Sequence, residues 1–96
     1  MAAIRLRDET LIAVSPDQVS CDLAGEAAIL NLKNSVYYGL DPVGASVWSL
    51  IQEPKTVAEI RRALLCIYEV DSAQLESDLQ ALLGQLSEQG LIDIQT

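Results

Sequence analysis

The side chains that most often carry out catalysis are scarce in this sequence. Histidine, the commonest general base and metal ligand, is absent. Cys21 and Cys66 are far apart and outside any Cys-x-x-Cys spacing, so they have no partner for a Cys–His nucleophile and are poor zinc ligands. Glu76 and Asp78, the closest acids on one expected helix, are two positions apart and point to different faces. We therefore expect no catalysis and neither a metal nor another cofactor.

The charge of the chain is strongly negative, with 14 acidic against 6 basic residues and a net charge of −8. No Lys or Arg follows Arg62. Because a nucleic-acid surface needs clustered cations to displace counterions from phosphates, we expect no binding to DNA or RNA. The acidic C-terminal third is either a solvated face that aids solubility or a surface that receives a neutral or basic peptide.

Length and composition are those of one small domain. The chain has 96 residues, of which 50% are hydrophobic and 4% aromatic, so its core has to be built mainly from Leu, Ile, Val and Ala. No apolar run is long enough to span a membrane, and no secretory signal follows Arg5 and Arg7. We expect a single cytoplasmic domain over residues 1–96, with Cys21 and Cys66 reduced and buried.

The elements that must position any binding surface are strands in the first half of the chain. Thr10 to Ser15 is expected to be a short strand or an extended arm. Val19–Leu23 and Ala27–Leu32 predict a hairpin, and Val36–Leu40 predicts a third strand after the turn formed by residues 33–35. A three-residue turn would pair Leu32 with Val36, Leu30 with Tyr38 and Ala28 with Leu40. This register is preferred because it places every large residue on one face.

The third strand runs directly into the first of three expected helices. Asp41 is a typical N-cap, and Pro42 suits the first helical position, where its missing N–H is not needed. The second helix opens with the capping box Thr56–Glu59, and the third begins after Asp71. The expected buried stripes are Val43, Val47, Leu50 and Ile51 in the first helix, Val57, Ile60, Leu64 and Ile67 in the second, and Leu75, Leu79, Leu82, Leu83 and Leu86 in the third.

Gly90 is expected to end the third helix in a left-handed conformation, before a short final strand over residues 91–94. The chain would then divide into an arm (1–15), a β-meander (19–40), a three-helix bundle (42–90) and the terminal strand. This order predicts an α+β, winged helix-turn-helix-like fold, with an N-terminal three-stranded antiparallel sheet, three helices and a short C-terminal strand. In a DNA-binding winged helix the third helix would enter the groove, but here it carries no cation.

Several motifs occur in an order that resembles the PqqD-like family, the peptide-recognition domains of pathways that modify ribosomally made peptides. They are Tyr-Tyr-x-Leu-Asp at 37–41, Gly-x-x-x-Trp at 44–48, Thr-Val-Ala-Glu-Ile at 56–60, Tyr-x-Val-Asp at 68–71, Asp-Leu-x-x-Leu-Leu-x-x-Leu at 78–86 and Gly-Leu-Ile at 90–92. The similarity covers roughly residues 19–94 and is greatest to the stand-alone leader-binding proteins of lasso-peptide clusters. The extra N-terminal segment from Ile4 to Ser15 departs from this pattern.

The resemblance implies β-augmentation, in which the leader of a precursor peptide adds as a strand to the free edge of the sheet and packs against the third helix. The peptide-binding residues would be Ser35, Val36, Tyr37, Tyr38 and Gly39 on the strand, with Gln74, Leu75, Asp78, Leu79 and Leu82 on the helix. Asp78 would receive a polar or cationic leader side chain. The family implies no catalysis by this chain, but delivery of the leader to separate enzymes, a leader peptidase and an ATP-dependent cyclase.

A second interpretation remains open from the sequence. The same fold could be a winged-helix protein–protein interaction or regulatory module that has no role in peptide maturation. Concentration-dependent dimerisation through the strand edge would favour this alternative, whereas a neighbouring precursor-peptide gene would favour the first. The expected oligomeric state is a monomer or a weak dimer.

Overall fold

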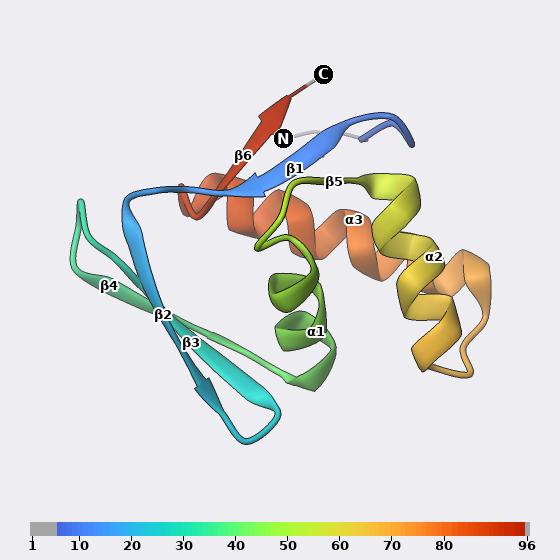
Figure 1. The fold of residues 1–96 in the computed structure, drawn as a ribbon, viewed down its shortest axis with the longest axis horizontal. Coiled ribbons are helices and arrows are strands. Elements are labelled where there is room, and N and C mark those ends of the chain that lie inside the picture. The colour runs from blue at the N-terminus through green and yellow to red at the C-terminus, as the bar shows by residue number, and fades with distance from the viewer. Residues whose placement is uncertain (1–5, 96) are drawn as a thin grey trace.

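A computed structural model describes residues 6–95 of the chain (Figure 1). The elements are β1 (Leu11–Val14), β2 (Gln18–Leu23), β3 (Glu26–Asn31), β4 (Val36–Leu40), α1 (Pro42–Leu50), β5 (Lys55–Thr56), α2 (Val57–Ile67), α3 (Ser72–Glu88) and β6 (Ile92–Gln95). They confirm the predicted α+β class, with an antiparallel sheet, three helices and a C-terminal strand. The predicted arm begins outside the described residues, because Met1 to Arg5 are not among them. None of the helices in residues 6–95 is long and apolar enough to cross a bilayer.

The first sheet has the strand order β2–β3–β4 and rests on α1. Ile29 of β3 is fully buried, and Ala27 and Leu40 beside it are nearly so. On the helix side, Val47 and Trp48 complete this part of the core. Within the described part of the chain β4 pairs only with β3, so the predicted third strand is an edge strand.

The predicted register between β3 and β4 is wrong by one residue. Four residues, not three, connect the strands. The observed pairs are Ala27–Leu40, Ala28–Gly39, Ile29–Tyr38, Leu30–Tyr37 and Asn31–Val36, in place of the expected Ala28–Leu40, Leu30–Tyr38 and Leu32–Val36. The cause is a buried polar residue: Asn31 donates from Nδ2 to the Gln89 carbonyl at 2.7 Å and accepts from the Lys33 amide at 2.9 Å. Ser35, with φ of 60°, closes the longer turn.

The helix caps were predicted correctly, because they depend on local sequence. The Asp41 carboxylate accepts from the Gly44 amide at 2.8 Å. Thr56 and Glu59 form the full capping box, and Asp71 accepts from the Gln74 amide. Gly90 has φ of 71°, as expected for a left-handed cap.

Two residues of the predicted buried stripes are exposed instead. Val43 is 39% exposed in the first turn of α1, and Ile67 is 59% exposed as the last residue of α2. Both lie at a helix end, beyond the part of the helix that packs against the core. The cysteines also differ from the prediction, because Cys21 and Cys66 are free thiols that are exposed.

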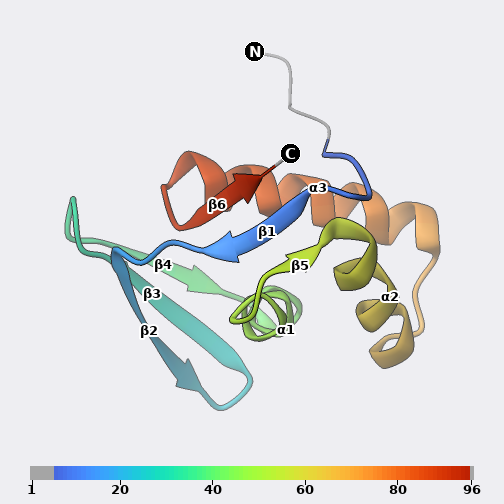
Figure 2. The same cartoon turned by 45° about the horizontal axis from the view of Figure 1, so that its top comes forward.

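The predicted N-terminal arm contains β1, which belongs to a second sheet with the strand order β5–β1–β6. β1 is its central strand, and Ile12 is fully buried. β6 begins at Ile92, one residue later than predicted, and pairs antiparallel with β1. β1 pairs with β5 near the middle of the chain and with β6 near its end, so this sheet joins three distant segments of the sequence (Figure 2).

Candidate peptide-binding site

The turn between β2 and β3 determines which residues of β4 direct their backbone N–H and C=O groups to the free edge. Ala24 and Gly25 have φ of 54° and 92° and form the two-residue turn between β2 and β3. In such a turn the flanking residues, Leu23 and Glu26, form a hydrogen-bonded pair. Bonding direction then alternates along β3, so Ala27, Ile29 and Asn31 direct their backbone groups toward β4.

The same alternation divides the predicted strand residues into two groups. Tyr38 directs its backbone groups to β3 and the Val36 amide donates to Asn34 Oδ1 at 3.0 Å, whereas Tyr37 and Gly39 direct their backbone groups to the free side. The Ser35 amide is also engaged, because it donates to the Asn31 carbonyl at 2.8 Å. A strand added at this edge would therefore bond chiefly to Tyr37 and Gly39.

Gly39 is not required by the packing of the chain itself. A Cβ at this position would meet nothing within 4 Å, and its φ lies outside the left-handed region. A glycine on an edge strand allows another backbone to approach closely. Its position at the free edge is compatible with such an approach.

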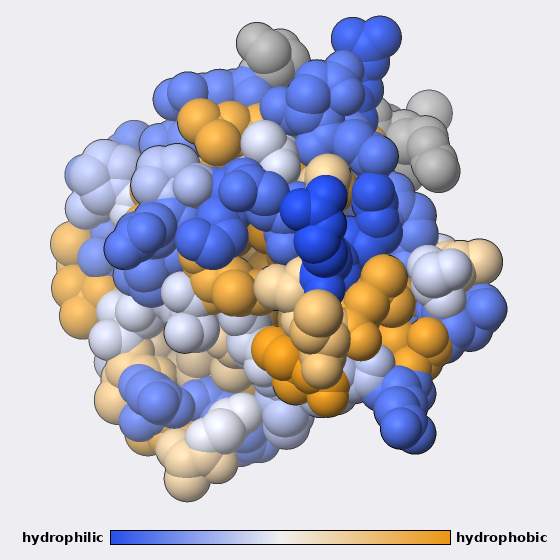
Figure 3. Space-filling model, turned by 45° about the vertical axis from the view of Figure 1, so that its right-hand side comes forward, coloured by the Kyte–Doolittle hydropathy of each residue, from blue (hydrophilic) through white to orange (hydrophobic). Residues whose placement is uncertain are grey.

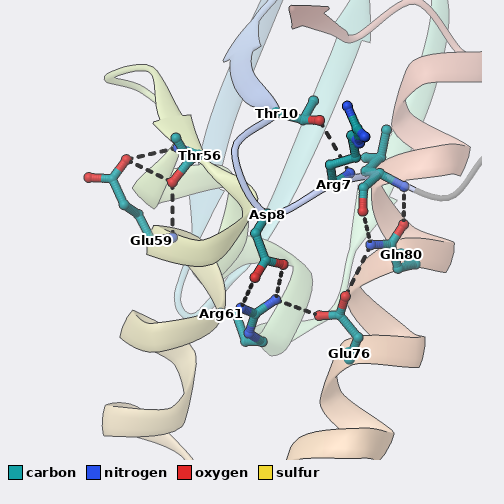
Figure 4. Close-up of polar contacts among 9 residues, drawn as sticks. Arg7, Asp8, Thr10, Thr56, Glu59, Arg61, Glu76 and Gln80 are labelled. Carbon is teal, nitrogen blue, oxygen red and sulfur yellow. Dashed lines mark hydrogen bonds and ion pairs between the residues drawn. The ribbon is translucent and has the colours of Figure 1, made fainter. Parts of the chain in front are cut away.

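One flank of α3 is covered by the N-terminal arm (Figure 4). Gln80 forms two hydrogen bonds with the backbone of Leu6, accepting from its amide at 2.8 Å and donating to its carbonyl at 2.9 Å. Arg61 of α2 bridges Asp8 at 2.9 Å and Glu76 at 3.0 Å. The hydrogen bonds that the Arg61 guanidinium donates to these two carboxylates raise its pKa above the ordinary value. This flank of α3 is therefore occupied by the chain itself.

The opposite flank of α3 is largely open, and it meets β4 at Gln85. Gln74 and Asp78 are exposed there and bond to each other at 2.9 Å. Leu82 is half-buried against the core. One turn further, the Tyr38 hydroxyl donates to Oε1 of the exposed Gln85 at 2.8 Å, which joins the edge strand to the helix.

The structure thus separates the ten predicted site residues by their accessibility. Leu75 and Leu79 are 5% and 2% exposed and belong to the core, so they can only support a groove from below. Tyr37 is 72% exposed and points away from the helix. Sequence reasoning did not include Gln85 among the site residues, although it follows Asp78 and Leu82 at helical spacing on the same flank.

Other surface features lie away from this flank. A hollow of about 400 Å³ lies between the β2–β3 hairpin and α1, lined by Ser20, Asp22, Ser46, Trp48 and Gln52 among others. The Trp48 indole N–H is buried without a hydrogen-bond partner. On the α2 side of the molecule, Figure 3 shows apolar side chains beside charged ones, and Leu65, Ile67 and Val70 are exposed at the end of this helix. No group of three or more His, Cys, Asp or Glu residues within 6–95 could hold a metal ion.

Comparisons with known proteins agree with this architecture. Residues 26–92 match the family of coenzyme PQQ synthesis protein D (PqqD). A solved structure of TbiB1 in complex with the TbiA(beta) leader peptide is 36% identical, with a TM-score of 0.80 over 84% of this chain and 94% of that chain. A lasso peptide synthetase B1 complexed with the leader peptide is 21% identical and shares the fold, with a TM-score of 0.75 over 85% of this chain and 96% of that chain. No curated protein matches the sequence.

Proposed function

Because the chain belongs to the PqqD family, we propose that it is a PqqD-like recognition element that binds the leader of a ribosomally made precursor peptide. The observation that carries this proposal is the placement of a free strand edge beside an uncovered helix flank. Within residues 6–95, β4 has no strand partner on one side, and its Tyr38 bonds Gln85 of α3, whose open flank continues through Leu82 and Asp78 at helical spacing. Two structures with this fold were solved with leader peptides bound, which supports the same class of ligand here.

The leader would add as a strand to β4. Its backbone would exchange hydrogen bonds with Tyr37 and Gly39, whose groups are directed to the free side. Alternate leader side chains would then face α3, since successive residues of a strand point to opposite faces. Leu82 would contact an apolar side chain, and Asp78 would pair with a polar or cationic one.

Ser35, Val36 and Tyr38 would take part less directly. The amide of Ser35 and the backbone of Val36 and Tyr38 are used within the chain. The Tyr38 side chain, held by Gln85, would form one wall of the groove, and Gln74 would orient Asp78 through their hydrogen bond. Leu75 and Leu79 would support the helix from the core.

The role we propose is that of an adaptor in lasso-peptide-type biosynthesis. It would hold the leader while a leader peptidase and an ATP-dependent cyclase act on the rest of the precursor. A binding function accords with the charge of the chain, because an acidic surface can receive a neutral or basic peptide.

Fluorescence polarisation with a labelled leader peptide from the neighbouring precursor gene tests this proposal. We expect saturable binding that unlabelled leader competes away. Tyr37→Pro removes a donor from the free side of β4 and should weaken binding at least about tenfold, because it costs one hydrogen bond and prevents close pairing. Tyr37→Ala separates the loss of the side chain from the loss of the donor.

The matched control is Ser20→Pro, which removes a donor from the other free edge of the same sheet. By the alternation described above, the Ser20 amide also points away from β3. This variant should bind the leader as the wild type does. Equal binding by folded Tyr37→Pro and Ser20→Pro variants would show that the β4 edge is not the site, and no binding by the wild type would refute the function.

A further inference from the structure

Short side chains leave a hollow between the β2–β3 hairpin and α1. On β2, Ser20 and Asp22 lie on the core side of the sheet, because their cross-strand partners on β3 are buried there. Ala45 and Ser49 line the hollow from α1. The space between these small residues is about 400 Å³. Pockets that hold small ligands have volumes of roughly 300–1,000 Å³, so the hollow can receive a side chain of another molecule.

Trp48 also lines this hollow and carries a hydrogen-bond donor. The residue is 4% exposed, and its indole N–H has no hydrogen-bond partner among residues 6–95. Packing accounts for Gly44 of the Gly-x-x-x-Trp motif, because a Cβ there would lie 3.2 Å from side-chain atoms of Leu40 and Asp41. Packing does not account for the indole N–H, since a phenylalanine would fill the core without burying an unpaired donor. The donor is left for an acceptor that enters the hollow.

β2 is the second free edge of the sheet, and it borders the hollow. Within the described residues β2 pairs only with β3. By the alternation described above, Gln18, Ser20 and Asp22 direct their backbone groups to the free side. The side chains of Ser20 and Asp22 line the hollow as well. A polypeptide that added to this edge as a strand would therefore lie beside the hollow.

The charges around the hollow select the kind of polypeptide. Among the described residues that line it, Asp22 is an acid and none is Lys or Arg. The whole chain carries a net charge of −8. An acidic segment would be repelled, whereas a neutral or basic one would be accepted.

We infer that the β2 edge and this hollow together form a second peptide-binding site, which takes an extended, neutral or basic segment of another protein. One side chain of the segment would enter the hollow and accept a hydrogen bond from Trp48. Asn or Gln suits this position, because the amide oxygen accepts while the NH₂ group donates to serine hydroxyls. A Lys two positions away would lie on the same face and pair with Asp22. The site goes beyond leader binding, because β2 and β4 are opposite edges of the sheet (Figure 1).

NMR spectroscopy of the isotope-labelled whole chain tests this inference, because Trp48 is the only tryptophan and gives a single indole N–H signal. The probe is the peptide acetyl-Lys-Val-Gln-Val-Lys-amide, whose Gln and Lys side chains share one face of a strand. We expect a saturable downfield shift of the indole proton as the peptide is added up to about 10 mM, since so short a strand binds weakly. Replacing the Gln of the probe by Leu should weaken binding about fivefold, the equivalent of one hydrogen bond. Replacing both Lys by Glu should also weaken it.

Three variants locate the site. Ser20→Pro removes a donor from the free side of β2, where proline is tolerated, and should weaken probe binding at least about tenfold. Ser49→Leu narrows the hollow from α1 and should weaken binding while the strand edge stays intact. Tyr37→Pro is the matched control on the β4 edge and should bind the probe as the wild type does.

Gln18 decides whether the indole N–H is already used within the chain. Its Oε1 is likewise buried without a partner among residues 6–95, and it lies on the same face of β2 as Ser20. Gln18→Leu should leave the indole signal of the free protein in place. An upfield shift in this variant as large as the shift that the probe produces would show that Gln18 and Trp48 bond each other, and would overturn the inference.

Other outcomes would also overturn it. They are an indole signal that does not move at the highest probe concentration, equal probe binding by the wild type and a folded Ser20→Pro variant, and an equal shift caused by acetamide at the same concentration. The last result would mean that the hollow takes an amide without strand addition. Leader binding should be unchanged in Ser20→Pro, so this inference and the proposed function are tested separately.

Discussion

Asn31 holds the β3–β4 turn against the end of α3, and its replacement should destabilise the protein far more than its place on a small surface sheet suggests. Its side chain is 7% exposed. Nδ2 donates to the carbonyl of Gln89, the C-cap residue of α3, at 2.7 Å, and Oδ1 accepts from the Lys33 amide at 2.9 Å. Asn31→Ala would leave both backbone groups without their partner.

The magnitude follows from these two bonds. A net intramolecular hydrogen bond stabilises by about 1 kcal/mol, and leaving a buried partner unsatisfied costs about 1–3 kcal/mol. For two backbone groups at a partly buried site, we expect the free energy of unfolding to fall by about 2–3 kcal/mol. In a domain of this size that lowers the melting temperature by roughly 10–20 °C.

Trp48 provides the assay. It is the only tryptophan of the chain and is 4% exposed, so its fluorescence should report urea-induced unfolding. Asn34→Ala is the matched control, because it removes one exposed hydrogen bond, from the Val36 amide to Asn34 Oδ1 at 3.0 Å. This control should cost about 0.5 kcal/mol.

The comparison of the two variants decides whether the reasoning holds. Equal losses for Asn31→Ala and Asn34→Ala would show that the buried bonds contribute no more than an exposed one. The altered β3–β4 register would then need another cause. If a folded Asn31→Ala variant bound the leader more weakly, this result would indicate that the turn also positions the β4 edge.

Three further outcomes are expected. Arg61→Gln breaks the ion pair that attaches the N-terminal arm at Asp8 and the pair that joins α2 to α3 at Glu76. Because these groups are partly solvated, the loss of unfolding free energy should be about 1 kcal/mol, measured by urea denaturation, and no loss would contradict the role given to the bridge. Hydrogen bonds from the Thr56 backbone and hydroxyl lower the pKa of Glu59 below its ordinary value. Its contribution to stability is therefore present at neutral pH and is lost as the pH falls through the lowered pKa, so the stability of Glu59→Gln should change less between neutral and acidic pH than that of the wild type. In dilute, native protein both Cys21 and Cys66 should react rapidly with a thiol reagent, and a requirement for denaturant would contradict their exposure.

The features predicted correctly from the sequence depend on neighbouring residues. Asp41, Thr56 and Asp71 cap their helices with side chains three positions from the amides they accept from. Such contacts form wherever the local sequence allows a helix to start. The order of strands and helices was predictable for the same reason, since each element has its own period and stop signals.

The features predicted wrongly depend on distant parts of the chain. The β3–β4 register follows from the bond between Asn31 and Gln89, which no local pattern shows. The sheet around β1 was missed because β5 has only two residues and pairs across the chain. Cys21 was expected to be buried, but it belongs to the outward, apolar side of β2.

Peptide binding at the β4 edge stays a prediction, and the structure decides only the geometry of that edge. The edge position of β4 could be inferred from its place at the end of the meander. Which of its residues direct backbone groups outward could not, because this depends on the turn at Ala24 and Gly25 and on the register that follows from it. The link between Tyr38 and Gln85 likewise requires the packing of the strand against α3.

The pairing of β1 with β6 has a consequence for the order in which the chain folds. Leu11 lies opposite Gln95, so almost the whole sequence separates two strands that bond to each other. Closing so long a loop is entropically costly and slow compared with forming the local β2–β3–β4 meander. During synthesis β1 and β6 can therefore pair only after β6 has left the ribosome, and the sheet with the free edge at β4 can form first.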